Sequence, residues 1–184
     1  MSQQAPIPNS YQIDKSVVNS DAPRGAHLWG GEYPGNNDPA LAQERIERFL
    51  DSGISHFINL TEADERLDHY DGLLQAAATN RNTAVSHQRI PIRDYSTPTP
   101  QYLIHILDAI DDSLAQGNSI YVHCWGGIGR TGTVIGCWLV RHGLSGEQAL
   151  AQIAHWRKNT PAGGTESPET DDQRNLILNW TETK

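Results

Sequence analysis

Cysteine, phenylalanine and methionine are all scarce in this chain. Its 184 residues include two cysteines, two phenylalanines and one methionine. Two cysteines, Cys124 and Cys137, are too few for a disulfide framework, which favours a reducing, cytoplasmic setting and leaves a thiol free for chemistry. No apolar run approaches the ~20 residues of a membrane-spanning helix, and the first residues lack the apolar core of a secretory signal. We therefore expect a cytoplasmic protein with no membrane partner.

Positive charge is also in short supply. Lys and Arg together number 14 and Asp and Glu 22, so the formal net charge is −8. This balance argues against a broad surface for nucleic acid or anionic lipid, and we expect no nucleic-acid partner. At ~100–200 residues per domain, the length suits one domain rather than two. Five Trp and six Tyr supply bulky area for its core.

The composition changes near residue 25. Residues 1–24 are rich in Gln, Pro, Ser and Asn with little periodicity, which predicts a flexible N-terminal arm that drapes over the domain. Residues 25–184 contain no internal repeat, and the stretch 159–168, with its prolines and glycines, lies between two helical patterns. This stretch is a loop rather than a linker, so residues 25–184 are predicted to form one domain.

Apolar periodicity predicts strands that alternate with helices. Runs rich in β-branched residues predict buried strands at 27–30, 54–60, 83–92 and 119–123. Helical spacing and capping residues predict helices after Asp38-Pro39, after a capping box formed by Thr61 and Asp64, and over 100–116, 130–142, 145–157 and 168–180, the last capped by Ser167. This order predicts an α/β fold whose central, mainly parallel sheet of about four to five strands is flanked by helices.

One segment joins a predicted strand to a predicted helix through a short glycine-rich loop. The strand ends at His123 and Cys124, glycines follow at 126, 127 and 129, and the helix begins near Arg130. Glycines allow successive backbone N–H groups to turn inward, and the helix dipole adds about half a positive charge at the same place. The segment is therefore predicted to hold a tetrahedral oxyanion such as phosphate.

The same field should stabilise a thiolate at Cys124, and thus a nucleophile at neutral pH. Five residues separate Cys124 from Arg130, a spacing that lets a curled loop bring the guanidinium beside the thiolate and bind two phosphoryl oxygens. Cys137 lies in the apolar helical segment V-I-G-C-W-L-V and is interpreted as a packing residue.

Residues 123–131, H-C-W-G-G-I-G-R-T, resemble the H-C-x5-R-[S/T] signature of the cysteine-dependent protein tyrosine phosphatases, and most of all their small dual-specificity branch. The resemblance implies that Cys124 forms a phosphocysteine intermediate and that Arg130 holds the transition state. It also implies that Thr131 hydrogen-bonds the thiolate, that His123 orients the loop, and that no metal or cofactor is needed. The implied phosphate-binding residues are Trp125, Gly126, Gly127, Ile128, Gly129 and Arg130.

The family also uses an aspartate about thirty residues upstream, on a loop after the preceding strand, as its general acid. Asp94 stands 30 residues before Cys124, follows a predicted strand and precedes two prolines, so it is the acid that the resemblance implies. Such a group protonates the leaving oxygen, a contribution typically worth ~10²–10⁴-fold in rate. Asp64, Asp68 and Asp71 lie on another predicted loop or helix and stay open as alternatives.

Two further resemblances are weaker. Residues 169–173, E-T-D-D-Q, are similar to the Q-T-x-x-Q segment that positions water in many tyrosine phosphatases, which makes Gln173 a candidate aid to hydrolysis and puts Glu169 where the family has a first Gln. Residues 28–35, L-W-G-G-E-Y-P-G, resemble a strand and turn near the start of small members, with no catalytic role assigned. Altogether the resemblance spans roughly residue 25 to the end, and implies a phosphatase-like catalytic domain.

The expected partner is a phosphorylated protein or a small phosphorylated molecule. No N-R-Y-type phosphotyrosine-recognition segment is visible, so a shallow pocket is expected, and the function predicted is a tyrosine or dual-specificity protein phosphatase. Phosphoinositide-selective relatives commonly carry lysines in the loop, and residues 125–129 contain none. Arg89 and Arg93 nonetheless keep phosphoinositides, inositol phosphates and RNA 5′-triphosphate ends open as substrates. A rhodanese-like sulfurtransferase and an inactive phosphate-binding module are the rival functions.

Overall fold

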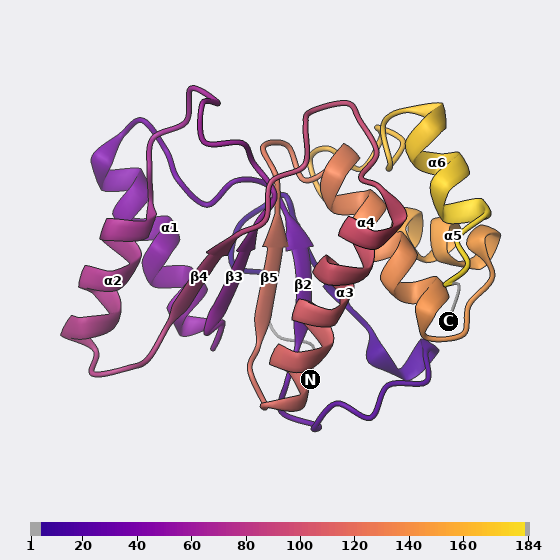
Figure 1. The fold of residues 1–184 in the computed structure, drawn as a ribbon. Coiled ribbons are helices and arrows are strands. Elements are labelled where there is room, and N and C mark those ends of the chain that lie inside the picture. The colour runs from indigo at the N-terminus through magenta and orange to yellow at the C-terminus, as the bar shows by residue number, and fades with distance from the viewer. Residues whose placement is uncertain (1–4, 183–184) are drawn as a thin grey trace.

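Five short strands form one sheet between two layers of helices (Figure 1). The computed structural model describes residues 5–182. The strand order is β1-β2-β5-β3-β4, in which β1 alone is antiparallel to its neighbour. The predicted α/β class with a mainly parallel sheet is therefore confirmed. The strands are β1 (Ser10–Ile13), β2 (Leu28–Gly31), β3 (His56–Asn59), β4 (Ser86–Arg89) and β5 (Ile120–His123).

Capping residues fix where most of the helices begin. The side chains of Asp38, Thr99 and Ser145 each accept a hydrogen bond from a backbone N–H in the first turn of the helix that follows. In the described part of the chain, no helix combines the length and apolar character needed to span a bilayer. The helices are α1 (Pro39–Asp51), α2 (Asp71–Asn80), α3 (Pro100–Ala115), α4 (Gly129–Arg141), α5 (Gly146–Arg157) and α6 (Asp171–Leu178), with a 3₁₀ turn at Lys15–Val17.

Side-chain alternation along the strands divides the core into two parts. Helices α1 and α2 cover one face of the sheet, and α3 to α6 cover the other (Figure 1). Successive strand residues point to opposite faces, so each central strand contributes an aromatic side chain to one face and an aliphatic one to the other. Trp29, Phe57 and Tyr121 pack on the α1 and α2 side, whereas Leu28, Ile58 and Val122 pack on the α3 to α6 side.

The sheet register brings three strand ends to one edge. Gly31 at the end of β2 and Asn59 at the end of β3 both pair with His123 at the end of β5. The chain segments that follow these strands therefore meet at the carboxyl edge of the sheet, where ligands gather in α/β folds.

The N-terminal arm predicted over residues 1–24 differs from the structure. Residues 10–13 form β1, which pairs with β2, and Ile7, Tyr11 and Ile13 are buried. The alternating S-Y-Q-I pattern is too short to stand out in a polar context, but its apolar side chains complete the core beside β2. Residues 1–4 of the predicted arm lie outside the described part of the chain.

Two predicted helix starts are wrong. No helix follows Thr61, because both its N–H and its hydroxyl donate to the side-chain oxygen of Asn59 in a local turn, at 2.9 and 2.7 Å. The next helix begins only at Asp71. The last helix begins at Asp171 rather than 168 and is capped by Thr170, since the Ser167 hydroxyl donates instead to the carbonyl of Ile128 at 2.7 Å.

His142 ties the N-terminal segment to the end of α4. Its Nδ1 lies 3.0 Å from the carbonyl oxygen of Asn19 and its Nε2 2.9 Å from Asp111 Oδ1. Because both partners are acceptors, the imidazolium form, which donates from both nitrogens, satisfies both contacts. Burial and Arg141 lower the pKa of His142, but the hydrogen bonds that it donates to Asp111 and Asn19 outweigh them, and the net shift is upward.

This clasp predicts a pH dependence of stability. A pKa that is higher in the folded than in the unfolded state gives a contribution that is complete below ~6.5 and is lost as pH rises through the folded pKa. Denaturant titrations of the parent and of His142→Gln between pH 5 and 8.5 should show the difference in unfolding free energy shrinking towards high pH. A difference that stays constant over this range would contradict the clasp.

Candidate active site

The loop between β5 and α4 is pressed tightly against the segment that follows β2. Gly127 has φ +69°, and a Cβ at this position would lie 2.3 Å from the carbonyl carbon of Gly31. The N–H of Tyr33 donates to the carbonyl of Trp125 at 2.8 Å. The W-G-G-E-Y segment therefore supports the loop, because glycines on both sides allow two backbones to approach this closely.

Helix α4 begins without a side-chain cap. Its N-cap residue is Ile128, whose side chain offers no hydrogen-bond acceptor. The first backbone N–H groups of a helix have no partner within the helix, and the dipole adds positive potential there. This end of α4 is thus suited to an anion, as the sequence predicted for the loop before Arg130.

A cavity of about 70 Å³ opens at this helix end. Cys124, 2% exposed, lines it from the end of β5, while Tyr95 and Trp125, 59% and 61% exposed, line it nearer solvent. The lining residues are Asp94, Tyr95, Cys124, Trp125, Gly126, Ile128, Gly129, Arg130 and Glu169.

Arg130 carries a buried positive charge beside the thiol, with 1% of its side chain exposed. Both carboxylate oxygens of Glu65 accept from the guanidinium: Nη1 donates to Oε1 at 2.5 Å, and Nη2 donates to Oε2 at 3.1 Å. Nη1 also donates to the carbonyl of Ile92 at 3.2 Å. The buried Nε has no hydrogen-bond partner among the described residues, although Asp94 Oδ1 lies 3.2 Å away as an ion-pair partner.

Asp94 reaches the cavity from the loop between β4 and α3. The next residue, Tyr95, adopts φ +56°, an uncommon conformation for a non-glycine residue and one that clusters at functional sites. Gln173 holds this loop from α6: its Nε2 donates to the carbonyl of Ser96 at 3.2 Å and its Oε1 accepts from the N–H of Thr170 at 3.2 Å. Since both ends of its amide are engaged, Gln173 fastens the loop of Asp94 to the start of α6.

His123 supports the loop from beneath. Its Nδ1 donates to the carbonyl of Cys124 at 3.1 Å, and its Nε2 accepts from the hydroxyl of Tyr70 at 2.7 Å. Burial lowers the pKa of His123 to about 3, so the ring is neutral. A neutral ring fits this pair of contacts, in which one nitrogen donates and the other accepts.

The predicted site residues fall into two groups. Cys124, Arg130, Asp94 and most of the loop line the cavity, whereas His123, Thr131 and Gln173 stand behind it. The hydroxyl of Thr131 donates to the carbonyl of Gly31 at 3.5 Å.

Other predicted positions are not part of the cavity lining. Arg89 and Arg93, expected to add charge at the mouth, are not among its described lining residues. Cys137 is buried in α4, and burial raises the pKa of its thiol far above the usual range, which fits the packing role.

Sequence reasoning missed Glu65 and Tyr70. Each lies in the irregular stretch between β3 and α2, more than 50 positions from its partner in the site. The one sequence signal for these two residues was that both follow a predicted strand, β3, whose carboxyl end lies at the same edge of the sheet as that of β5.

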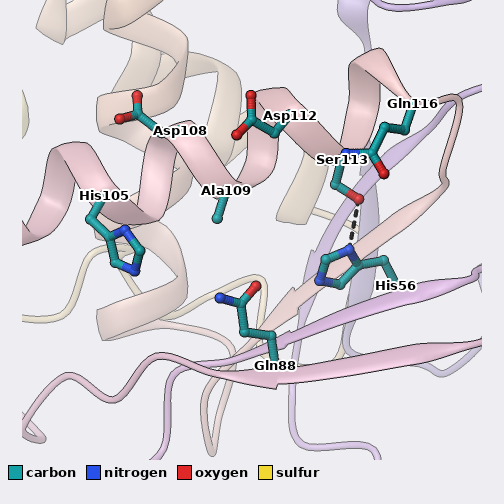
Figure 2. A pocket seen from close by; sticks show the side chains of 8 residues that line it. All are labelled: His56, Gln88, His105, Asp108, Ala109, Asp112, Ser113 and Gln116. Carbon is teal, nitrogen blue, oxygen red and sulfur yellow. Dashed lines mark hydrogen bonds between the residues drawn. The ribbon is translucent and has the colours of Figure 1, made fainter.

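A larger hollow of about 300 Å³ lies between α3 and the strands β3 and β4 (Figure 2). Figure 2 shows His56 joined to the hydroxyl of Ser113 at 2.7 Å, with Gln88 and His105 nearby. Its described lining contains no thiol, lysine or arginine. Over residues 5–182 no group of three or more His, Cys, Asp or Glu side chains is placed to hold a metal ion. The pairing of a nucleophile with a cation thus belongs to the smaller cavity.

The glycine conformations generate a matched pair of variants. Gly127→Ala places a methyl group at a positive φ and against the backbone of Gly31, so it should lower the unfolding free energy by roughly 1–3 kcal/mol. Gly126→Ala meets only Ile128, at 3.7 Å, and should change it by less than about 0.5 kcal/mol. Denaturant titration of both variants makes the comparison, and equal effects would contradict the tight contact.

Comparison with known proteins places this geometry in a family. A family model described as "Polymorphic toxin system, DSP-PTPase phosphatase" matches residues 30–144, more than half of the chain. The chain is 31% identical over 106 residues to the putative tyrosine phosphatase 067L of Invertebrate iridescent virus 3, across 52% of this chain and 38% of the relative. It is 27% identical over 153 residues to the tyrosine-protein phosphatase CDC14 of Candida albicans, across 83% of this chain and 26% of that protein. The chain thus spans well under half the length of these curated relatives.

The fold also resembles solved structures. One is a kinase-associated phosphatase in which serine replaces the catalytic-site cysteine, with a TM-score of 0.72, 21% identity, and coverage of 96% of this chain and 94% of that one. This likeness concerns the fold, and the range matched by the family model includes both Asp94 and the loop of Cys124. The chain therefore belongs to the DSP-PTPase family within the cysteine-dependent protein tyrosine phosphatase superfamily.

Proposed function

We propose that this protein hydrolyses phosphomonoesters on protein side chains, with tyrosine or dual specificity, through a phosphocysteine intermediate. The observation that carries the proposal is a buried thiol and a buried guanidinium on one cavity of about 70 Å³, at a helix end that no side chain caps. The contact between Arg130 Nε and Asp94 Oδ1 at 3.2 Å supports it further, because a phosphoryl oxygen can take the place of this carboxylate at the buried cation.

The first step transfers the phosphoryl group to sulfur. The thiolate of Cys124 attacks phosphorus, the bond from phosphorus to the ester oxygen breaks, and Asp94 gives a proton to the departing oxygen. Arg130 and the N–H groups of the loop and of α4 stabilise the charge on the phosphoryl oxygens. The position of Asp94 supports this role, because its carboxyl lines the same cavity as Cys124 and lies 3.2 Å from Arg130 Nε, within reach of a phosphoryl group bound there.

The second step releases phosphate. Water attacks the phosphocysteine, the carboxylate of Asp94 accepts a proton from that water, and the bond from sulfur to phosphorus breaks to return the thiolate. We assign Thr131 to hydrogen-bond this thiolate, since its bond to Gly31 is long at 3.5 Å and is easily exchanged. Gln173 acts by holding the loop of Asp94, and the expectation that it positions water stays a prediction.

Side chains projecting from a polypeptide suit the shape of the mouth. The two large aromatics nearest solvent, Tyr95 and Trp125, are more than half exposed, and flat faces at this position can contact an aromatic or aliphatic side chain that carries the phosphate. Measurements of kcat/KM on phosphopeptides, phosphoinositides, inositol phosphates and RNA 5′ ends should rank the substrate classes that the sequence left open. A higher value on any of the last three would overturn the protein specificity.

Replacing the nucleophile provides the central test. Cys124→Ser should lower the hydrolysis of p-nitrophenyl phosphate by about 10⁴-fold or more, because serine is not ionised in this site. The parent should retain its rate in excess EDTA. Cys137→Ala, which removes the other thiol from the core, is the matched control and should keep the activity. Chelator-sensitive turnover, or an active Cys124→Ser protein, would exclude the phosphocysteine route.

Replacing Asp94 tests its role as the acid that protonates the leaving oxygen. Asp94→Ala should lower kcat ~10²–10⁴-fold on phenyl phosphate, whose leaving oxygen needs the proton, and much less on an aryl phosphate with an acidic leaving group. KM should change little. The matched variant Asp64→Ala removes an exposed carboxylate outside the described cavity lining and should behave like the parent. If Asp64→Ala showed the leaving-group effect instead, the acid would lie there.

A further inference from the structure

The cavity mouth carries more negative than positive side chains. Among the described residues that line it, Arg130 is the only base, whereas Asp94 and Glu169 each bring a carboxylate. Arg66 lines a separate hollow of about 280 Å³ that adjoins the cavity at Trp125. The balance of charges among the side chains that line the cavity therefore opposes a ligand that adds several negative charges.

The charge of Arg130 is already shared between two carboxylates. Glu65 occupies both terminal nitrogens, and Asp94 faces Nε at 3.2 Å. One phosphate can replace Asp94 at Nε and use the N–H groups at the start of α4. No further cationic side chain of the described lining then remains for a second phosphate.

Glu169 is anchored at this place by its backbone. Arg174 donates from Nη1 to the carbonyl of Pro168 at 2.9 Å and to that of Glu169 at 3.3 Å, and the next residue, Thr170, caps α6. The side-chain Oε2 of Glu169 lies 3.3 Å from the position that a Cβ on Gly129 would occupy. The carboxylate thus rests beside the first residue of α4, where the positive end of the helix favours it.

We propose that Glu169 is a specificity-determining residue that limits the substrate to a single phosphate and disfavours molecules bearing a second phosphate next to the first. The inference rests on the proposed function, and it narrows the substrate to a monophosphorylated side chain. A dianionic phosphate about 5 Å from one exposed carboxylate is disfavoured roughly tenfold by repulsion in water. The charge of the phosphate at Cys124 is offset by Arg130 and by the N-terminal end of α4. The charge of a second phosphate beside it is not offset by any cationic side chain of the described lining.

The test compares one monophosphate with one polyphosphate. Phosphate release from a phosphotyrosine peptide without acidic neighbours and from inositol hexakisphosphate is measured for the parent, Glu169→Gln and Glu169→Lys. The ratio of kcat/KM for the polyphosphate to that for the peptide should rise roughly tenfold in Glu169→Gln and further in Glu169→Lys. Glu166→Gln is the matched control, because Glu166 lies on the same loop, is 83% exposed and is not among the described lining residues. Its ratio should stay that of the parent.

A binding measurement gives a readout that does not depend on turnover. Calorimetry on Cys124→Ser, with and without Glu169→Gln, should show a gain of roughly tenfold in affinity for inositol hexakisphosphate and a smaller one for inorganic phosphate. An unchanged ratio, or the same rise in Glu166→Gln, overturns the role of Glu169 while the phosphatase activity stands. A parent that hydrolyses neither substrate overturns the proposed function itself.

Discussion

A buried guanidinium organises this site. Taking the charge of Arg130 out of water costs several kcal/mol unless partners are supplied, and the protein supplies the carboxylate of Glu65 and the carbonyls of Leu60 and Ile92. These partners come from the segments after β3 and β4. One guanidinium thus joins both segments to the start of α4, the first through an ion pair and the second through a carbonyl, and Asp94 lines the same cavity as the thiol. Cys124, Arg130 and Asp94 are brought to one cavity by a single burial requirement.

Local patterns were enough to predict that Cys124 and Arg130 lie together at the start of a helix. The thiol, the glycines and Arg130 lie within seven consecutive residues, and the strand before and the helix after them have clear apolar periodicity. Their relative positions follow from one turn of chain, so no long-range contact had to be guessed. The parallel sheet followed from the alternation of strands and helices.

The errors arise from specific contacts that a pattern within one segment does not reveal; one is local, and the others join distant parts of the chain. Thr61 has the residues of a helix start, but the side chain of Asn59 takes its N–H and hydroxyl. β1 has a weak pattern of its own and becomes a strand by pairing with β2. Glu65 is one charge among several neighbours in the sequence, and its role depends on Arg130, 65 positions away. In each case the partner decides the structure.

The two margins of the sheet are treated differently. The apolar strand β2 would present Leu28 and Trp29 along an open margin if β1 did not pair with it. At the opposite margin, β4 is four residues long and entirely polar, Ser-His-Gln-Arg, and in the described part of the chain it pairs with β3 alone. Short polar strands are poor templates for the addition of another chain. By pairing with β2, the N-terminal strand β1 thus protects the sheet against edge-to-edge polymerisation at the margin where the apolar sequence of β2 would favour it.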